Sequence, residues 1–158
     1  MIKALFFTTI LAIGLSVGGS NWVSAQTAAP AARAATSSEI KLFAQFAPSP
    51  PPAPFIWVMN MYAVAGQYAL VGFSNPNSGI MALLQNVSGH WTLIERTGGQ
   101  ITVQEMQDET HGAMSAVTAE SLYKLTQKQT QVPGVPIKLH CSSNGVVCVQ
   151  QVQESPPK

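Results

Sequence analysis

The sequence has few charged residues. Only 9% of its 158 residues are Asp, Glu, Lys or Arg, and 8 basic residues nearly balance 7 acidic ones. Nucleic acid binding depends on clustered Lys and Arg that face phosphates, whereas the basic residues here stand singly. We therefore expect no nucleic acid partner. The hydrophobic fraction of 46% excludes a chain that is disordered throughout.

Sequence motifs of catalysis are also lacking. No serine lies in the nucleophile-elbow pattern of hydrolases, and Asp108 is the only aspartate. The length corresponds to one domain. We therefore favour a noncatalytic protein and expect no cofactor. The alternative is a small secreted hydrolase, in which a serine and a carboxylate would meet His90 or His111.

A long hydrophobic run occurs only at the N-terminus. Residues 4–17 are apolar or small, Lys3 precedes them, and Val23-Ser24-Ala25 follows. This order is typical of a signal peptide cleaved after Ala25, and the run is shorter than the roughly 20 residues that span a membrane. We expect a signal peptide over residues 1–25, a secreted or periplasmic protein, and no stable membrane span after cleavage.

The remaining chain divides by composition into three segments. Residues 26–38 are mostly Ala, Ser and Thr, with no larger apolar residue to bury, and we expect a flexible leader there. Residues 39–152 supply the alternating apolar residues of a folded domain. Residues 153–158 are expected to form a loose tail.

An antiparallel meander is predicted in the first half of this domain. Aromatic and branched residues alternate with turn clusters at roughly ten-residue spacing. The predicted strands are 55–64, 68–73, 80–87 and 90–96, with a loop over 74–79. In the last strand Trp91 and Leu93 share a face with Glu95, and we expect Trp91 and Leu93 to pack inward against a helix.

Three short helices are predicted beside the meander. Thr36 and Glu39 have the spacing of a capping box, and so do Thr102 and Glu105. A stronger helix is predicted over 119–128, with Thr118 as its N-cap and an ion pair between Glu120 and Lys124. The fold class is therefore a single small α+β domain, an antiparallel meander of four to six strands with one face covered by short helices.

The two cysteines flank a strong hairpin signal. With Asn144 and Gly145 as the central turn residues, Cys141 falls directly opposite Cys148. Opposed residues of antiparallel strands lie about 4.5 to 5.5 Å apart at Cα, a range that a disulfide accepts. Because export leads to an oxidising compartment, we predict a disulfide between them; a redox-active pair is the alternative.

Candidate metal ligands are sparse. On a regular strand Met59 and Met61 share a face, and with His111 they form the candidate set for Cu(I), which thioethers and imidazoles bind. Further residues could add to this set: Met81, Met106, Met114, His90 and His140. For the methionines we favour core packing over metal binding, because Phe55 and Trp57 lie on the same predicted face.

The meander resembles a group of small exported bacterial proteins of unassigned function. The motifs that carry the resemblance are Gly66-Gln67-Tyr68-Ala69-Leu70-Val71-Gly72, Ala82-Leu83-Leu84, Gly89-His90-Trp91-Thr92-Leu93-Ile94 and Gly98-Gly99. Such proteins are common in cyanobacteria, and some are labelled as associated with copper uptake. The resemblance implies a similar fold over about residues 66–125, and it implies no catalytic residues.

These observations favour a small exported noncatalytic protein, either a binding protein of unknown ligand or an envelope-associated one. Two alternatives stay open. One is a periplasmic copper-binding protein that uses Met and His ligands, and the other is the secreted hydrolase described above.

We predict that exported protein contains the Cys141–Cys148 disulfide. Closing this small loop should stabilise the fold by about 2.5 kcal/mol, so reduction should lower the free energy of unfolding by that order. Alkylation without prior reduction, followed by mass spectrometry, should leave both cysteines unmodified. Two alkylated cysteines in exported protein would rule the bond out.

Overall fold

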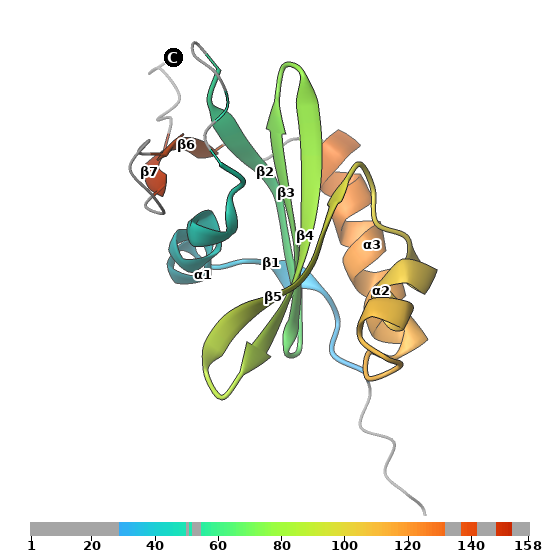
Figure 1. Cartoon of the computed structure of the whole chain (residues 1–158). Helices are drawn as coiled ribbons and strands as arrows, with labels where there is room; N and C mark the ends of the chain where they lie inside the picture. Colours follow the sequence, from blue (N-terminus) through green and yellow to red (C-terminus); the bar gives the residue numbers. More distant parts are fainter. Residues whose placement is uncertain (1–28, 50, 52–54, 132–136, 142–147, 153–158) are drawn as a thin grey trace, which may run out of the picture.

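The computed structural model describes residues 29–49, 51, 55–131, 137–141 and 148–152 (Figure 1). The predicted signal peptide, the first residues of the predicted leader, the Asn144-Gly145 turn and the predicted tail lie outside the described residues.

One antiparallel sheet forms the centre of a single α+β domain. Its strands follow the order β5-β4-β3-β2-β6-β7 (Figure 1). They are β2 Trp57–Ala65, β3 Tyr68–Asn75, β4 Ser78–Val87, β5 His90–Gly98, β6 Ile137–Cys141 and β7 Cys148–Val152. A two-residue strand, β1 (Arg33–Ala34), also pairs with β2. The predicted meander is confirmed as β2 to β5.

The turns of the meander are tighter than composition predicted. The expected loop over 74–79 is only the pair Pro76-Asn77, because β3 continues to Asn75 and β4 begins at Ser78. The Asn75 side chain stabilises this turn, since its Oδ1 accepts a hydrogen bond from the Asn77 amide at 2.9 Å. This local hydrogen bond thus stabilises a two-residue turn where a longer loop was predicted.

All three predicted helices are present. They are α1 (Ser37–Phe43), which continues into the 3-10 helix η1 (Ala44–Phe46), α2 (Val103–Glu109) and α3 (Ala116–Gln131). Both predicted capping boxes are formed, and Lys124 pairs with Glu120 at 2.9 Å. The predicted cap of α3 is wrong, because Ser115 Oγ accepts from the Thr118 amide at 3.2 Å and the helix begins earlier.

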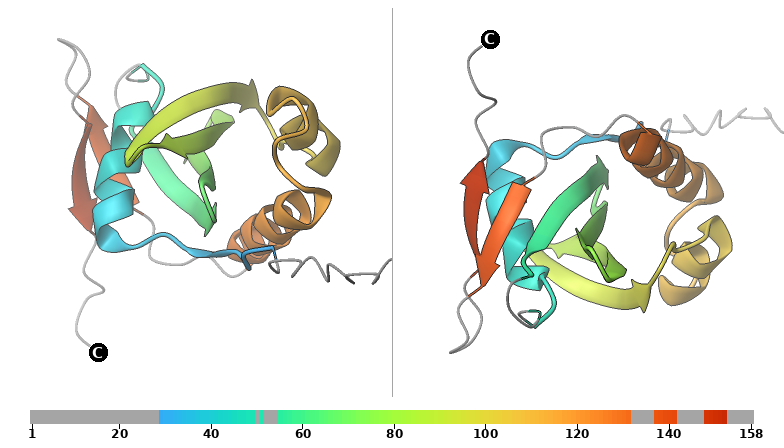
Figure 2. Two further views of the ribbon diagram at one scale, coloured as in Figure 1. Left: turned by 90° about the horizontal axis from the view of Figure 1, so that it is seen from below. Right: turned by 90° about the horizontal axis from the view of Figure 1, so that it is seen from above.

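Helices cover both faces of the sheet, not one as predicted. Figure 2 shows α1 and the β6–β7 pair on one side, here called the α1 face, and α2 and α3 on the other, the α3 face. The central strands are apolar on both faces, so each face requires its own cover. Val71 and Phe73 belong to the α1-face core, and Leu70 and Leu83 to the α3-face core. No helix in the described part is long and apolar enough to cross a membrane.

A β-bulge divides the two methionines of β2. Met59 pairs with Phe73, but Met61 pairs with the adjacent Gly72, so Asn60 is an extra residue on this strand. The extra residue reverses the alternation of side chains. Met59 consequently lies in the α1-face core and Met61 packs on the α3 face, which corrects the prediction that they share a face.

A second bulge corrects the predicted faces of β5. Leu93 pairs with Leu84 and Glu95 with Leu83, which leaves Ile94 as the extra residue. Arg96 therefore joins the face of Trp91, and Glu95 lies on the opposite face. The Arg96 guanidinium donates a 2.8 Å hydrogen bond to the carbonyl of Phe46 in η1, so this bulge connects the edge strand to the helix layer.

The segment that precedes α1 is part of the fold. The Ala32 amide donates to Ser121 Oγ of α3 at 2.7 Å, β1 pairs with β2, and the Ala35 amide donates to the Tyr62 carbonyl at 2.9 Å. The predicted flexible leader is therefore wrong from Ala32 onward. The prediction considered only buriable side chains, whereas this segment is held mainly by backbone hydrogen bonds.

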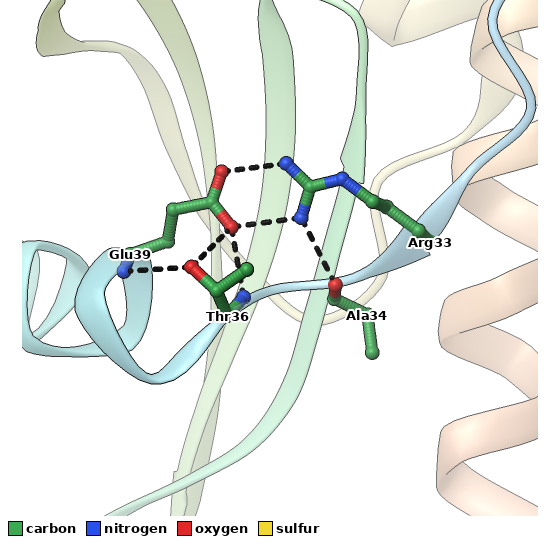
Figure 3. A network of polar contacts seen from close by, with 4 residues as sticks. All are labelled: Arg33, Ala34, Thr36 and Glu39. Atoms are coloured by element: carbon green, nitrogen blue, oxygen red, sulfur yellow. Dashed lines mark hydrogen bonds and ion pairs between the residues drawn. The ribbon is translucent and has the colours of Figure 1, made fainter.

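A bidentate ion pair joins β1 to the N-terminus of α1 (Figure 3). The Arg33 guanidinium donates to both Glu39 carboxylate oxygens at 2.8 and 2.7 Å, and Glu39 Oε2 also accepts from the Thr36 amide at 2.8 Å. These bonds favour the ionised carboxylate, foremost the pair with Arg33. They lower the pKa of Glu39 from its usual 4.5 to about 2.

We predict that the Glu39 charge stabilises the fold at neutral pH by about 1 to 2 kcal/mol, after allowance for solvent screening at the half-exposed Arg33. The folded-state pKa lies below the unfolded one, so this stabilisation is complete above pH 4.5 and is lost as pH falls toward 2. Glu39→Gln keeps a capping side chain and removes the charge. Denaturant titrations should show the two proteins converging in stability over this pH range.

The matched control is Glu120→Gln, because the Glu120–Lys124 pair is exposed on both sides and such pairs contribute little. A Glu39→Gln effect that stays constant between pH 7 and 2 would contradict the role of the charge.

Trp91 joins the edge strand to α1. Its ring meets the ring of Phe43 edge-on, with centroids 5.0 Å apart and an interplanar angle of 84°. The inward packing that was expected of Leu93 is wrong, because this residue is 40% exposed. Phe43 is completely buried, and its contact with Trp91 helps to shield it from solvent.

We predict that Trp91→Ala lowers the free energy of unfolding by about 1 to 3 kcal/mol, below the 3 to 5 typical of a fully buried aromatic residue. Leu93→Ala should stay within about 0.5 kcal/mol of the parent. Denaturant titration measures both. Equal effects of the two substitutions would refute the packing role of Trp91.

Candidate functional site

The predicted metal ligands are not brought together. Met59 is completely buried on the α1 face, Met61 is half-buried on the α3 face, and His111 is exposed in the turn after α2. The burial of Met59, Met81, Met106 and Met114 confirms core packing for these four side chains. Among the described residues, no group of three or more His, Cys, Asp or Glu side chains is placed to hold a metal ion.

The two histidines considered for a hydrolase are both exposed. His90 begins β5, and His111 has a positive φ of 51° at the end of α2. In the described part of the chain no hydrogen bond joins either imidazole to a serine or a carboxylate. The structure thus places neither of them in a Ser-His-carboxylate arrangement.

The cysteines face each other at the level of the backbone. In the β6–β7 ladder Cys141 pairs with Cys148, the register that the hairpin signal predicted. This register places their Cα atoms within disulfide range, and the bond itself stays a prediction.

Two hollows of similar size open on the described surface. The first, of about 340 Å³, lies between the β2–β3 turn and the start of α3. Most polar side chains that line it already bond to one another: Gln67 Nε2 to Tyr68 Oη at 3.2 Å, and Ser115 Oγ to Thr118 Oγ1 at 2.9 Å. This first hollow therefore has few side-chain groups left for a ligand.

The second hollow, of about 360 Å³, lies at the opposite end of the sheet and is here called the turn pocket. Its lining is Ser49, Pro51, Phe55, Trp57, Asn75, Asn77, Ser78 and Ile80. The β3–β4 hairpin supplies four of these residues, and its tip extends beyond α1 in Figure 1.

Strand alternation places the polar residues of the turn pocket. Phe73 pairs with Ile80 on the α1 face, and two positions further along the same row Asn75 pairs with Ser78. The apolar row therefore ends in an amide and a hydroxyl. Because the covering helices end at Phe46 and prolines follow, these two side chains stay beyond the helix layer.

Trp57 connects the segment after η1 to the sheet. Its indole Nε1–H donates to the Ser49 carbonyl at 2.9 Å, and the residue is only 4% exposed. This bond satisfies the one polar group of a nearly buried aromatic side chain. It also holds Ser49 across the sheet end, which shapes one wall of the turn pocket.

The turn pocket has open hydrogen-bonding groups and no charge. Asn75 Oδ1 accepts from the backbone amide of Asn77, but the Nδ2 group of Asn75, the side-chain amide of Asn77 and the hydroxyl of Ser78 have no partner among the described residues. None of the described residues that line the pocket is ionisable. The pocket thus combines partly exposed aromatic surface at Phe55 with a neutral rim of donors and acceptors.

The turn pocket was not predicted from the sequence. Residues 74–79 were predicted to be a loop, and Phe55 and Trp57 were predicted only to share a strand face with the methionines. A usable signal was present, because two asparagines and a serine follow an apolar strand near two aromatic residues. Only the pairing of β2 with β3 brings these two segments to the same end of the sheet.

Comparisons of the chain with family models, curated proteins and solved structures found no match in any of the three. The candidate site therefore rests on the chemistry of its own residues.

Proposed function

We propose that this protein is a small exported, noncatalytic binding protein that holds a small uncharged molecule in the turn pocket. The observation that carries the proposal is the pocket's lining, whose described residues combine aromatic surface with open amide and hydroxyl groups and include no ionisable side chain. Ligand pockets typically have this composition and volumes of about 300 to 1,000 Å³. Its 360 Å³ fits a small ligand.

The absence of charge in the lining argues for a neutral ligand. An ion that leaves water for a site without an opposite charge loses hydration and gains little in return. Phosphates, carboxylates and metal ions are therefore poor candidates for this pocket. A neutral molecule avoids the penalty, because the open groups of Asn75, Asn77 and Ser78 can replace its bonds to water.

Export is supported by the N-terminal sequence. Lys3, the apolar run over 4–17 and Ala25 together match a cleavable signal peptide. A binding protein in a secreted or periplasmic location would meet small molecules outside the cytoplasm. The copper-binding alternative has the resemblance in its favour, but Met59 and Met61 lie on opposite faces of the sheet.

The proposal predicts that some neutral small molecules raise the melting temperature while phosphate and acetate at equal ionic strength do not, because a ligand that binds only the folded state stabilises it. A thermal-shift screen with mixed neutral compounds measures this. Phe55→Ala should abolish the stabilisation by any hit, since it removes the exposed aromatic surface.

Gln67→Ala is the matched control, because Gln67 lines the other hollow. A hit whose effect is lost in Gln67→Ala and kept in Phe55→Ala would contradict the site. Stabilisation by none of the neutral compounds would contradict the proposed function.

A further inference from the structure

We infer that the ligand of the turn pocket is a neutral saccharide, an inference that rests on the proposed function. A sugar ring has an apolar C–H face and a rim of hydroxyl groups that both donate and accept hydrogen bonds. The pocket has the complementary halves: the half-buried ring of Phe55 beside the nearly buried Trp57, and the neutral rim formed by Asn75, Asn77 and Ser78.

The amide side chains give the strongest argument. An asparagine offers a carbonyl acceptor and an NH₂ donor on one planar group, so it can bond to two neighbouring hydroxyls at once. Asn77 has both groups free among the described residues, and Asn75 keeps its Nδ2 free while its Oδ1 holds the turn. Asn75 is thus fixed in orientation by the same turn that presents Asn77.

A purely apolar ligand fits this rim less well. It would cover the amides and the hydroxyl of Ser78 without bonding to them, and each covered polar group without a partner costs about 1 to 3 kcal/mol. A charged ligand would find no counter-charge in the lining. A polyhydroxylated neutral ring avoids both costs and can also place its C–H face on Phe55.

NMR spectroscopy tests this inference, because it reports ligand binding at individual residues of the turn pocket. ¹H–¹⁵N NMR spectra of the purified protein are recorded with methyl α-D-glucopyranoside, methyl α-D-galactopyranoside, N-acetylglucosamine, maltose and cellobiose. Cyclohexanol and benzyl alcohol, neutral rings with one hydroxyl, are the comparison compounds. At least one saccharide should shift the signals of the Trp57 indole and of the Asn75 and Asn77 side-chain amides.

Variants then separate the two halves of the pocket. Asn77→Ala should weaken saccharide affinity by about fivefold, the loss expected for one hydrogen-bonding side chain. Phe55→Tyr should keep most of the affinity because it keeps the ring. Phe55→Leu should weaken it by about fivefold because it keeps apolar area but removes the aromatic face. Gln67→Ala should leave it unchanged.

The outcomes distinguish this inference from the proposed function. If only cyclohexanol or benzyl alcohol shifts the pocket signals, the saccharide assignment is overturned and the binding function stands. If no compound of either class, and none in the thermal-shift screen, binds, both fail. Saccharide binding that is unaffected in Asn77→Ala and Phe55→Leu would also overturn the assignment.

Discussion

The backbone of β2 is the element on which the rest of the fold depends. Along one edge it pairs with β3, and along the other it is shared among several partners. Trp57 to Met59 pair with β6, and Ala63 and Val64 pair with β1. Between them the Tyr62 amide donates to Gln129 Oε1 of α3 at 3.0 Å. A buried backbone amide without a partner is costly. The backbone groups along this edge of β2 therefore help to fix the positions of β6, β1 and α3.

The Asn60 bulge in β2 determines how the two cores are divided. It moves Met61 to the α3 face and leaves Met59 beside Phe73 on the α1 face. Asn60 Nδ2 bonds to Ser74 Oγ at 3.1 Å, whereas its Oδ1 is buried without a partner among the described residues. The bulge thus places one methionine on each face of the sheet and separates residues that a regular strand would place together.

The turn pocket forms because the β3–β4 hairpin is longer than the helix layer, α1 and η1, that covers the α1 face. The β3–β4 hairpin continues past the end of η1, so the last row of the α1 face has no helix above it. The residues in that row change from Phe73 and Ile80 to Asn75 and Ser78. The sheet therefore supplies the support, and the end of the β3–β4 hairpin supplies the polar groups. This arrangement suits binding, because rigid support limits the entropy lost on association.

Local patterns in the sequence were sufficient for the elements themselves. Alternation and turn residues located the four strands of the meander, and the Thr36–Glu39 and Thr102–Glu105 spacings located two helix starts. These features depend on residues within four positions of one another, which a single sequence displays directly. The register of Cys141 with Cys148 was predictable because the Asn144-Gly145 turn signal lies between them in the sequence.

Features that depend on distant residues required the tertiary structure. A bulge is a property of two paired strands, so the separation of Met59 from Met61 and of Trp91 from Glu95 could not be seen in either strand alone. The ordering of residues 32–38 comes from bonds to β2 and α3, and the turn pocket comes from bringing Trp57 beside the Asn75–Ser78 turn. Sequence by itself determined which segments are strands and helices; the long-range pairing of β2 decided which side chains meet.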